Sequence, residues 1–570
     1  MVVKKDDVSI VLCGPAGQGI QTVEMLMIHI LKNSELNLFA TKEYMSRVRG
    51  GSNSTELRIS SYKIQSYVDR IDVLIPFDYD SFNRIKKRIS EETVIIGEKE
   101  KLVKNSENEE FDIIDLPLSK SAKDVGSMLY LNIIVVGILT ALFKIEKDNV
   151  EQAIKTSFQK KGDNIVNKNL EAVKKGYELG AELSSNDINI EMEKDASVKD
   201  EIIINGGEAV GMGAIAGGCN FISSYPMTPS TSVLTFLAQQ SENFDIIAEQ
   251  AEDEIAAINM AIGSWYAGGR GMVTTSGGGF ALMVEGVSLA AILESPIVIH
   301  LAQRPGPATG LPTRTEQGDL LFALYSGHGE FPRVIYAPGT LRDAFYMTQK
   351  AFKIADKYQI PVIVMTDQYF IDSYHNMPKL DATAENIENH VVKTDEAYQR
   401  YAPAENGVSP RGIPGHGGGL VVVDSDEHDH EGHITEDHDI RIEMVDKRLK
   451  KYETMQEDME MPELVGTEDY ETLVVCWGST FPIVKEAIEQ LNTENVALLY
   501  FKQVYPVPTG VSEYFNKAQD IIIVEGNATA QLAQILKLHC DIDIQKNILK
   551  YNGLQFSVEE LVEKLNESIK

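Results

Sequence analysis

Cysteine is scarce in this sequence. Only Cys13, Cys219, Cys476 and Cys540 occur in 570 residues. Their wide spacing contains no CxxC pair and suggests no disulfide framework. We therefore do not expect the chain to ligate an iron–sulfur cluster or another metal by itself.

Basic residues are also in deficit. The chain has 53 Lys and Arg residues against 85 Asp and Glu residues, which gives a formal net charge of −32 at pH 7. Nucleic-acid binding depends on basic patches that face phosphates. The charge balance therefore argues against a nucleic-acid partner and favours small molecules or proteins.

Long apolar runs are absent as well. The longest, residues 128–143, contains Asn132, and it is shorter than the roughly 18 residues typical of a membrane span. The N-terminal sequence MVVKKDDVSIVLCG lacks the form of a signal peptide because acidic residues interrupt its apolar part. We predict a buried helix in this run, no membrane partner and a cytoplasmic location.

The length and the pattern of apolar runs predict a multidomain α/β protein. A chain of 570 residues is too long for one hydrophobic core, and strands that alternate with helices indicate mostly parallel, doubly wound sheets. We predict a small α/β domain at 1–185, a polar linker at 186–201, a second α/β domain at 202–384, an irregular Pro/Gly- and acid-rich connection at 385–466, and a C-terminal α/β domain at 467–570.

The motif GPAGQG at 14–19 follows the first expected strand. Its spacing is GxxGxG, whereas dinucleotide-binding turns have GxGxxG and an acidic residue after the second strand. The motif favours a tight strand-to-helix turn over an NAD site. The N-terminus of the following helix could still hold a phosphate-bearing ligand.

Histidines gather between acidic residues at 424–439. A metal site is one interpretation, but the spacings match no strong zinc signature. A solvated loop is the interpretation that we favour.

The stretch ISSYPMTPSTSVLTFLA at 222–238 places prolines on both sides of Thr228. Pro226 and Pro229 restrict the backbone, so that the Thr228 hydroxyl is held in one place. That hydroxyl could cap the following helix, with Pro229 as the first helical residue, or it could bind a ligand. Ser230 or Thr231 could cap instead and leave Thr228 available.

A group of acids begins the next expected helix. We predict that Glu249, Glu252, Asp253 and Glu254 all lie at its start, where acids complement the helix dipole. Four acids exceed that need. Glu254 leads directly into the apolar sequence IAAINMAIG, where a partly desolvated carboxylate could share a proton with a ring nitrogen.

Two glycine-rich segments complete the expected site. TTSGGG at 274–279 places Ser276, Gly277 and Gly278 between a strand and a helix, where a ligand can approach the backbone closely. Arg304 follows a buried strand at the edge where open α/β sheets bind ligands, and a guanidinium can hold a carboxylate with two hydrogen bonds. The loop after Arg304 carries hydroxyls that include Thr313.

Several long motifs resemble the alpha subunit of the 2-oxoacid:ferredoxin oxidoreductases, in the form with a fused N-terminal gamma domain (2-oxoglutarate synthase type). They include SSYPMTPSTS, EDEIAAINMAIGSWYAGGRGMVTTSGGG, LAQRPGPATGLPTRTEQGDL, PVIVMTDQYFIDS and SPRGIPG, and for the gamma part GPAGQGIQT and SRVRGGSNSTELRIS. The resemblance implies a Rossmann-like gamma domain, a doubly wound domain that binds the pyrimidine of thiamine diphosphate, and a C-terminal domain like that of transketolase.

The resemblance also implies roles for individual residues. Glu254 matches the glutamate that binds the pyrimidine nitrogen N1′, with Glu252 and Glu249 as weaker matches. Thr228 and Arg304 match positions that hold the oxoacid, and Thr313 matches a position at the far end of the substrate. The residues implied to line the site are Tyr225 for the substrate, and Pro226, Met227, Ser276, Gly277 and Gly278 for the cofactor. Met227 replaces the isoleucine usual in this motif.

The implied reaction is the coenzyme A-dependent oxidative decarboxylation of a 2-oxoacid, with electrons passed to ferredoxin. The chain has no GDG motif followed by Asn-Asn and no CxxC pair, so a beta subunit is implied to carry Mg²⁺, the diphosphate site and a [4Fe-4S] cluster. We expect a heterodimer or a dimer of heterodimers. The substrate expected is 2-oxoglutarate, with pyruvate and branched-chain or aryl 2-oxoacids open. A non-catalytic module that binds coenzyme A or a nucleotide is the alternative from another class, and an NAD-linked dehydrogenase is disfavoured.

Overall fold

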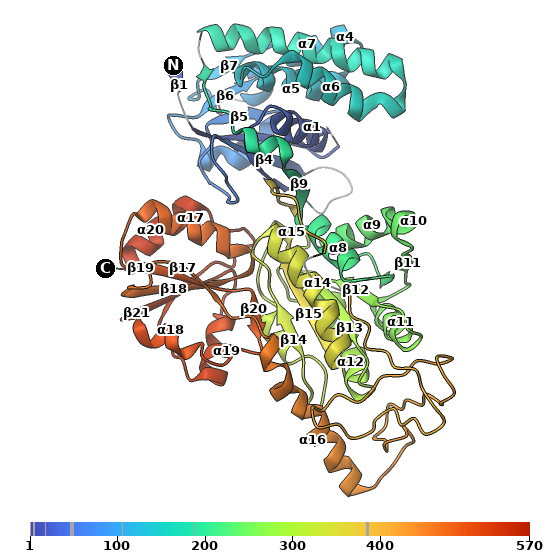
Figure 1. The fold of residues 1–570 in the computed structure, drawn as a ribbon. Helices are drawn as coiled ribbons and strands as arrows, with labels where there is room; N and C mark the ends of the chain where they lie inside the picture. Colours follow the sequence, from blue (N-terminus) through green and yellow to red (C-terminus); the bar gives the residue numbers. More distant parts are fainter. Residues whose placement is uncertain are drawn as a thin grey trace. The chain divides into compact units, whose positions relative to one another are not determined.

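The computed structural model describes residues 2–3, 6–17, 19–45, 51–104, 107–186, 188–383 and 387–569. The chain divides into two compact units (Figure 1). Unit 1 comprises Met1–Ile204, Asp372–Lys379 and Ser557–Glu560, and unit 2 comprises Asn205–Ile371, Leu380–Phe556 and Leu561–Lys570. The finer domain boundaries stay a prediction. The boundary at 384/385 and the part of the gamma-like motif at 46–50 lie outside the described residues.

Unit 1 is built on an eight-stranded sheet in the order β7-β6-β5-β2-β4-β3-β16-β9. The predicted strands are present, but the sheet is mixed rather than mostly parallel. One half is parallel, and β4 is antiparallel to both β2 and β3 because β3 and β4 follow each other without a crossover helix. The strands are β2 (Asp7–Pro15), β3 (Asn37–Glu43), β4 (Ser52–Ser60), β5 (Val73–Pro76), β6 (Val94–Gly97), β7 (Ile113–Asp115), β9 (Ile202–Asn205) and β16 (Tyr374–Met377).

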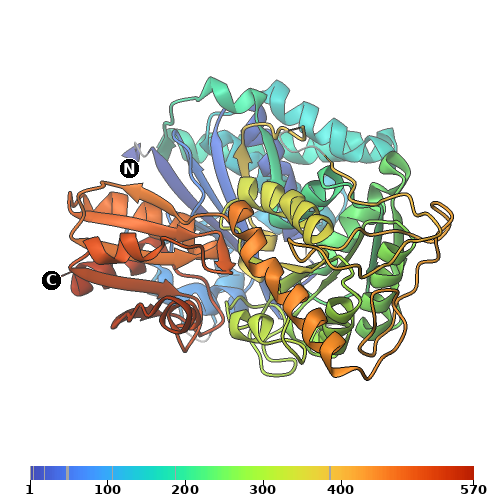
Figure 2. The same ribbon diagram turned by 60° about the horizontal axis from the view of Figure 1, so that its bottom comes forward.

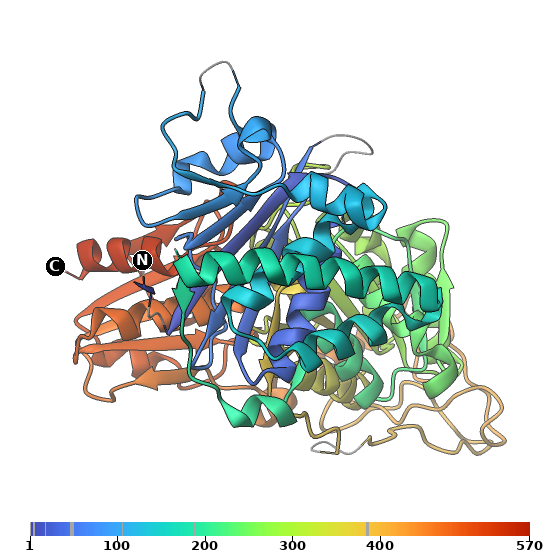
Figure 3. The same ribbon diagram turned by 90° about the horizontal axis from the view of Figure 1, so that it is seen from above.

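Alternating side chains of β2 separate two hydrophobic cores. Ile10 and Leu12 belong to the larger core, whereas Val11 and Cys13 belong to the smaller core on the other face. The larger core also contains residues of α1 (Ile20–Asn33), α5 (Leu131–Leu142) and α7 (Asp163–Asn186), and Figure 3 shows α7 running alongside α5.

Helix α5 confirms the buried helix predicted within residues 128–143, because every residue of α5 is buried. A Cβ atom at Gly137 would lie 2.2 Å from the Val173 carbonyl oxygen, so this glycine lets α5 and α7 pack backbone to backbone. Among the described residues, no single helix is long and apolar enough to span a membrane. One bent pair, Leu118–Val125 with Met128–Leu142, satisfies length and composition alone.

Unit 2 contains a seven-stranded sheet in the order β11-β10-β12-β13-β15-β14-β20. Its pairs are parallel except for β14 with β20. The five strands predicted here are all present, which confirms the α/β class. They are β10 (Phe221–Ser224), β12 (Gly271–Thr275), β13 (Ile297–Gln303), β14 (Val334–Tyr336) and β15 (Pro361–Asp367).

A second sheet in unit 2 has the order β17-β19-β18-β21-β22. Helix α17 (Phe481–Leu491) covers one face, and α18 (Ser512–Lys517) and α19 (Gln531–Cys540) cover the other (Figures 1 and 2). The short strand β20 (Gln503–Tyr505) leaves this segment and pairs with β14. The last third of unit 2 is thereby joined to the seven-stranded sheet. The five strands are β17 (Glu463–Gly466), β18 (Thr472–Trp477), β19 (Val496–Phe501), β21 (Asp520–Glu525) and β22 (Lys546–Leu549).

The His-rich stretch at 424–439 runs from an irregular segment into the first residues of helix α16 (His438–Thr454). His428 is fully buried, with its ring 3.9 Å from that of Tyr401, so the interpretation of a solvated loop is wrong for this residue. His430 contacts Glu443 at the surface across 3.1 Å. No group of three or more potential metal ligands occurs in the described parts of the chain.

Candidate functional site

Glu254 is the first residue of helix α11 (Glu254–Tyr266) and the buried member of the acidic group. Its side chain is 3 % exposed, and its Oε1 atom has no hydrogen-bond partner among the described residues. Asp253 instead caps the helix by accepting a hydrogen bond from the Ala256 amide across 2.8 Å. The prediction that all four acids share this helix is wrong, because Glu249 lies in the edge strand β11 (Ile247–Gln250).

The glycines of helix α12 (Gly277–Ile292) allow this carboxyl group to approach the helix closely. A Cβ atom at Gly279 would lie 2.6 Å from Oε1 of Glu254. Ser276 precedes the helix, and its buried hydroxyl neither caps it nor finds another partner among the described residues. At Gly278 a Cβ atom would meet only the Ala308 carbonyl oxygen, 3.8 Å away.

Arg304 follows β13 and contacts the loop between β10 and α9 (Thr231–Gln239). Its Nη1 atom donates a hydrogen bond to the backbone carbonyl oxygen of Thr228 across 2.7 Å. The Thr228 hydroxyl takes no part in this hydrogen bond. Burial lowers the pKa of Arg304, while the Asp319 carboxyl group opposes that effect.

The loop around Thr228 does not cap α9 as expected. The helix begins at Thr231 rather than Pro229, and the cap residue Ser230 makes no side-chain cap bond. Its hydroxyl donates to the Met227 carbonyl oxygen across 2.7 Å, which turns the loop back on itself. The interpretation of Thr228 as the helix cap, and of Ser230 as its replacement, is therefore wrong.

Asp319 was not predicted from the sequence as a site residue. A Cβ atom at Gly277 would lie 2.6 Å from its Oδ2 atom, so this carboxyl group lies against the first turn of α12. Burial raises the pKa of Asp319 to about 6; the Glu316 carboxyl group adds to the rise and Arg304 opposes it. Oδ2 is buried without a partner in the described part of the chain. Asp319 follows the Pro- and Gly-rich loop after Arg304, and no sequence motif marks it. Only its distance to Gly277 in the structure identifies it as a site residue.

The loop that carries Arg304 and Asp319 is fixed at Gln317. The Gln317 side chain donates to the Trp477 carbonyl oxygen across 2.8 Å and accepts from the Gly526 amide across 2.7 Å. Thr315 also donates to Asp367 across 3.0 Å. The C-terminal part of unit 2 therefore holds the end of this loop in place.

The remaining predicted residues are more exposed than Glu254 and Ser276. Tyr225 is 41 % exposed, and Pro226, Met227 and Thr313 are half-buried. No hydrogen bond among the described residues joins Thr313 to Thr228 or Arg304, so its substrate role stays a prediction.

Three buried oxygen atoms without hydrogen-bond partners among the described residues thus lie near the first turn of α12. They belong to Glu254, Ser276 and Asp319. A buried polar atom without a partner costs free energy unless a ligand supplies one. The arrangement fits a ligand that offers ring nitrogens and an amino group to the carboxyl groups, with Arg304 available for an anion. This is what the pyrimidine of thiamine diphosphate and a 2-oxoacid would present.

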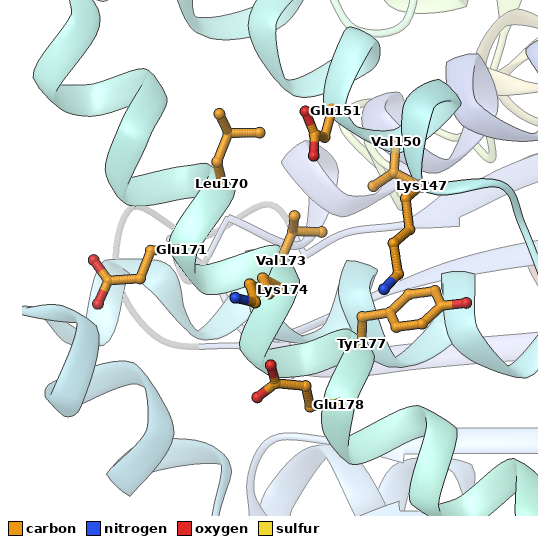
Figure 4. A pocket seen from close by; sticks show the side chains of 9 residues that line it. All are labelled: Lys147, Val150, Glu151, Leu170, Glu171, Val173, Lys174, Tyr177 and Glu178. Atoms are coloured by element: carbon orange, nitrogen blue, oxygen red, sulfur yellow. The ribbon is translucent and has the colours of Figure 1, made fainter.

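Two of the cavities in unit 1 are lined by residues that lie far from these in the sequence. The larger, about 510 Å³, lies between α6 (Lys147–Phe158) and α7, and Figure 4 shows the Lys and Glu side chains and the Tyr177 ring that line it. The other, about 200 Å³, is lined by Gly17, Gly19 and parts of β3 and β4. Gly17 and Gly19 have φ angles of 87° and 76°, which confirms a tight turn at the GPAGQG motif.

Comparison with known families places these features in a class. Residues 212–470 match the family profile "Pyruvate flavodoxin/ferredoxin oxidoreductase, thiamine diP-bdg", and residues 9–179 match "Pyruvate ferredoxin/flavodoxin oxidoreductase". The chain is thus a thiamine-dependent oxidoreductase subunit. All the site residues predicted from the sequence lie within the first of these matches.

Relatives define the family more closely. The chain is 31% identical to the 2-oxoacid:ferredoxin oxidoreductase subunit alpha of a Sulfolobus species, over 98% of this chain and 96% of the relative. It is 33% identical to the 2-oxoglutarate synthase subunit KorA of Archaeoglobus fulgidus, over 63% of this chain and 97% of the relative. A solved 2-oxoglutarate:ferredoxin oxidoreductase from Magnetococcus marinus, with 2-oxoglutarate, coenzyme A and succinyl-CoA bound, matches all of both chains at 30% identity and a TM-score of 0.92.

The chain belongs to the family of 2-oxoacid:ferredoxin oxidoreductase alpha subunits. This confirms the resemblance, the enzyme class and thiamine diphosphate as the cofactor. The name of the family also implies a further subunit and ferredoxin as the electron acceptor.

Proposed function

We propose that this chain is the catalytic alpha subunit of a 2-oxoglutarate:ferredoxin oxidoreductase that forms succinyl-CoA from 2-oxoglutarate and coenzyme A. The observation that carries the proposal is the group of unpartnered buried oxygens of Glu254, Ser276 and Asp319, described above beside Arg304. The named ligands of the Magnetococcus marinus enzyme support this choice of substrate and product.

Glu254 would hold the pyrimidine ring of the cofactor. Thiamine diphosphate, when bound, would supply the nucleophilic carbon and the electron sink that a 2-oxoacid needs to lose its carboxyl group as carbon dioxide. The Oε1 atom of Glu254 is buried and unpaired in the described structure, so it can hold a proton shared with a ring nitrogen. Gly278 leaves the backbone open for close approach, whereas Asp319 lies against Gly277 and would share that side of the site with the cofactor. Pro226 and Met227 would line the same site.

Arg304 and the Thr228 hydroxyl would position the substrate. The guanidinium uses Nη1 to bind the Thr228 carbonyl, which leaves its other donors for the carboxylate of the oxoacid. Because the hydrogen bond from Arg304 uses the Thr228 backbone carbonyl, the Thr228 hydroxyl remains available for the keto oxygen of the substrate. Tyr225 and Thr313 would extend this site toward the far end of the substrate.

A beta subunit would cover the exposed side of the site. Apolar side chains are exposed on loops, on helices and on the edge strand β11 near the named residues, where a partner can bury them. They are Tyr225, Ile247, Ile255, Leu282 and Leu311. We propose that this partner carries GDG and CxxC motifs, Mg²⁺ and a [4Fe-4S] cluster. The assembly would be a heterodimer or a dimer of heterodimers in the cytoplasm.

The test is reconstitution with a co-expressed beta subunit. Reduction of a low-potential dye is measured with coenzyme A and 2-oxoglutarate, pyruvate, a branched-chain or an aryl 2-oxoacid. We expect the highest kcat/KM with 2-oxoglutarate and no activity from the chain alone. Another preferred 2-oxoacid would refute the substrate, and dye reduction by the isolated chain would refute the need for a partner. A chain that binds coenzyme A without any 2-oxoacid turnover would support the non-catalytic alternative.

A further inference from the structure

A cavity of about 250 Å³ lies at the other end of helix α11 from Glu254. It is lined by the last turns of α11, the end of α12 and parts of the irregular segment before α16. The α11 residues that line the cavity run from Asn259 to Tyr266, so the cavity extends from about 7 Å to about 18 Å along the helix from Glu254. None of its residues is among those assigned above to the reaction.

Two buried arginines line this cavity, which we call the arginine pocket. Arg400 is 3 % exposed and Arg411 is 5 % exposed. Each has partners for part of its guanidinium: Arg400 donates to the Glu294 carbonyl oxygen across 2.8 Å, and Arg411 donates to Asp356 across 2.5 Å. Nη1 of Arg400 and Nε of Arg411, however, have no hydrogen-bond partner in the described structure.

Positive charge exceeds negative charge around the pocket. Glu294 pairs with Lys447 and Lys451 across 2.8 and 2.7 Å, and Arg400 also faces it. Asp356 is shared by Arg411 and Arg270, at 2.5 and 2.6 Å.

In the described structure, these two carboxylates therefore serve five cations, in a chain whose net charge is −32. Buried cations without compensation are unfavourable, and a bound anion would supply the missing charge.

The other residues that line the arginine pocket indicate the chemistry of the uncharged part of the ligand. Ile262, Trp265, Leu289, Leu293 and Val423 give an apolar lining beside the arginines. A hydrated inorganic anion would gain nothing from this lining, whereas the apolar body of an organic acid would be buried against it. We propose that the arginine pocket binds a small organic carboxylate, with its carboxylate on Arg400 and Arg411 and its apolar body against α11 and α12.

Gly263 provides a test that leaves both arginines in place. It lines the pocket, and a Cβ atom at this position would meet nothing within 4 Å. Gly263→Leu should therefore place its Cβ atom without a clash, occupy pocket volume with the rest of the side chain and favour the helix. Arg400→Lys is the second variant, since it keeps the charge but removes the guanidinium fork.

The experiment is isothermal titration of the full chain with benzoate, benzamide and inorganic phosphate, in an Arg304→Met background that removes the other anion site. We expect benzoate to bind, and to bind at least tenfold more weakly to the Gly263→Leu and Arg400→Lys variants. Benzamide, which has the same shape without the charge, should also bind at least tenfold more weakly. Circular dichroism checks that each variant is folded.

Three results would overturn the proposal: no heat with benzoate, equal binding of benzoate and benzamide, or benzoate binding that the folded Gly263→Leu variant retains. Binding of phosphate in preference to benzoate would overturn the carboxylate class and indicate a site for inorganic anions.

Discussion

Arg304 donates a hydrogen bond to the backbone carbonyl oxygen of Thr228 across 2.7 Å. The two residues follow different strands of one sheet, β13 and β10, and the bond fixes the guanidinium relative to the loop that carries the hydroxyl. This hydrogen bond uses the backbone of Thr228 and not its side chain. The two residues can therefore be tested separately.

Substitutions at Thr228 should change substrate binding without moving Arg304. We expect Thr228→Ser to retain most activity and Thr228→Val to lower kcat/KM by about 10–100-fold, because only valine removes the hydroxyl. Arg304→Lys should lower kcat/KM by a similar or larger factor, since lysine lacks the planar fork. Steady-state kinetics of the reconstituted enzyme measure both effects. Equal loss in the serine and valine variants would show that the hydroxyl is not used.

Glu254→Gln should abolish most activity while the fold persists. Loss of a positioned proton-transfer group typically costs about 10²–10⁴-fold in rate, and glutamine preserves the volume of the buried side chain. Glu252→Gln is the matched control, because Glu252 is exposed just before the same helix. Comparable kcat values for the two variants would exclude Glu254 from the chemistry.

Neighbouring glycines of α12 should respond differently to alanine. Gly279→Ala would force a Cβ atom to 2.3 Å from Oγ1 of Thr275 and 2.6 Å from Oε1 of Glu254, so the melting temperature should fall. Gly278→Ala meets only an ordinary contact at 3.8 Å. Its fold should persist, while binding of thiamine diphosphate to the reconstituted enzyme should weaken. Unchanged cofactor affinity in Gly278→Ala would show that the cofactor does not approach this glycine.

Asp319 should make the free protein less stable as the pH rises. Its folded-state pKa of about 6 lies above the ordinary aspartate pKa of 3.8. The folded state therefore binds the proton more tightly than the unfolded state, and stability falls as the pH rises from about 4 through 6. Asp319→Asn should remove this loss and gain about 1–3 kcal/mol at pH 8 relative to pH 4.

Chemical denaturation at both pH values measures the difference for Asp319→Asn. Asp446→Asn, on the exposed side of α16, controls for the loss of one negative charge. A gain of equal size at both pH values would assign the effect to something other than ionisation of Asp319.

The sequence predicted the strands of the seven-stranded sheet well because each is a short apolar run bounded by glycine, proline or polar residues. It missed β11, because this edge strand is mostly exposed and carries Glu249 and Gln250. The mixed sheet of unit 1 was also missed, since alternation of strands and helices does not reveal which neighbours pair without a crossover.

In the candidate site, too, features set by the local sequence were predicted and features set by long-range packing were missed. Thr228, Glu254 and Arg304 stood out because proline, helix polarity and strand ends restrict where their side chains can be. The unpaired oxygen of Asp319 and its distance to Gly277 depend on how a loop folds back on α12, and no local pattern encodes that. The cap expected at Ser230 failed because its hydroxyl found a nearer partner in the Met227 carbonyl.

The Gln317 contacts limit how this enzyme could be re-engineered. Exchanging the segment from Arg304 to Asp319 with that of a relative, in order to change the oxoacid that is used, would disturb the hydrogen bonds of the Gln317 side chain with the backbone groups of Trp477 and Gly526. The inserted loop would keep its own side chains, but the C-terminal segment would no longer hold it in place. A successful chimera must therefore carry both the loop and the C-terminal segment that it contacts, although 160 positions separate Gln317 from Trp477.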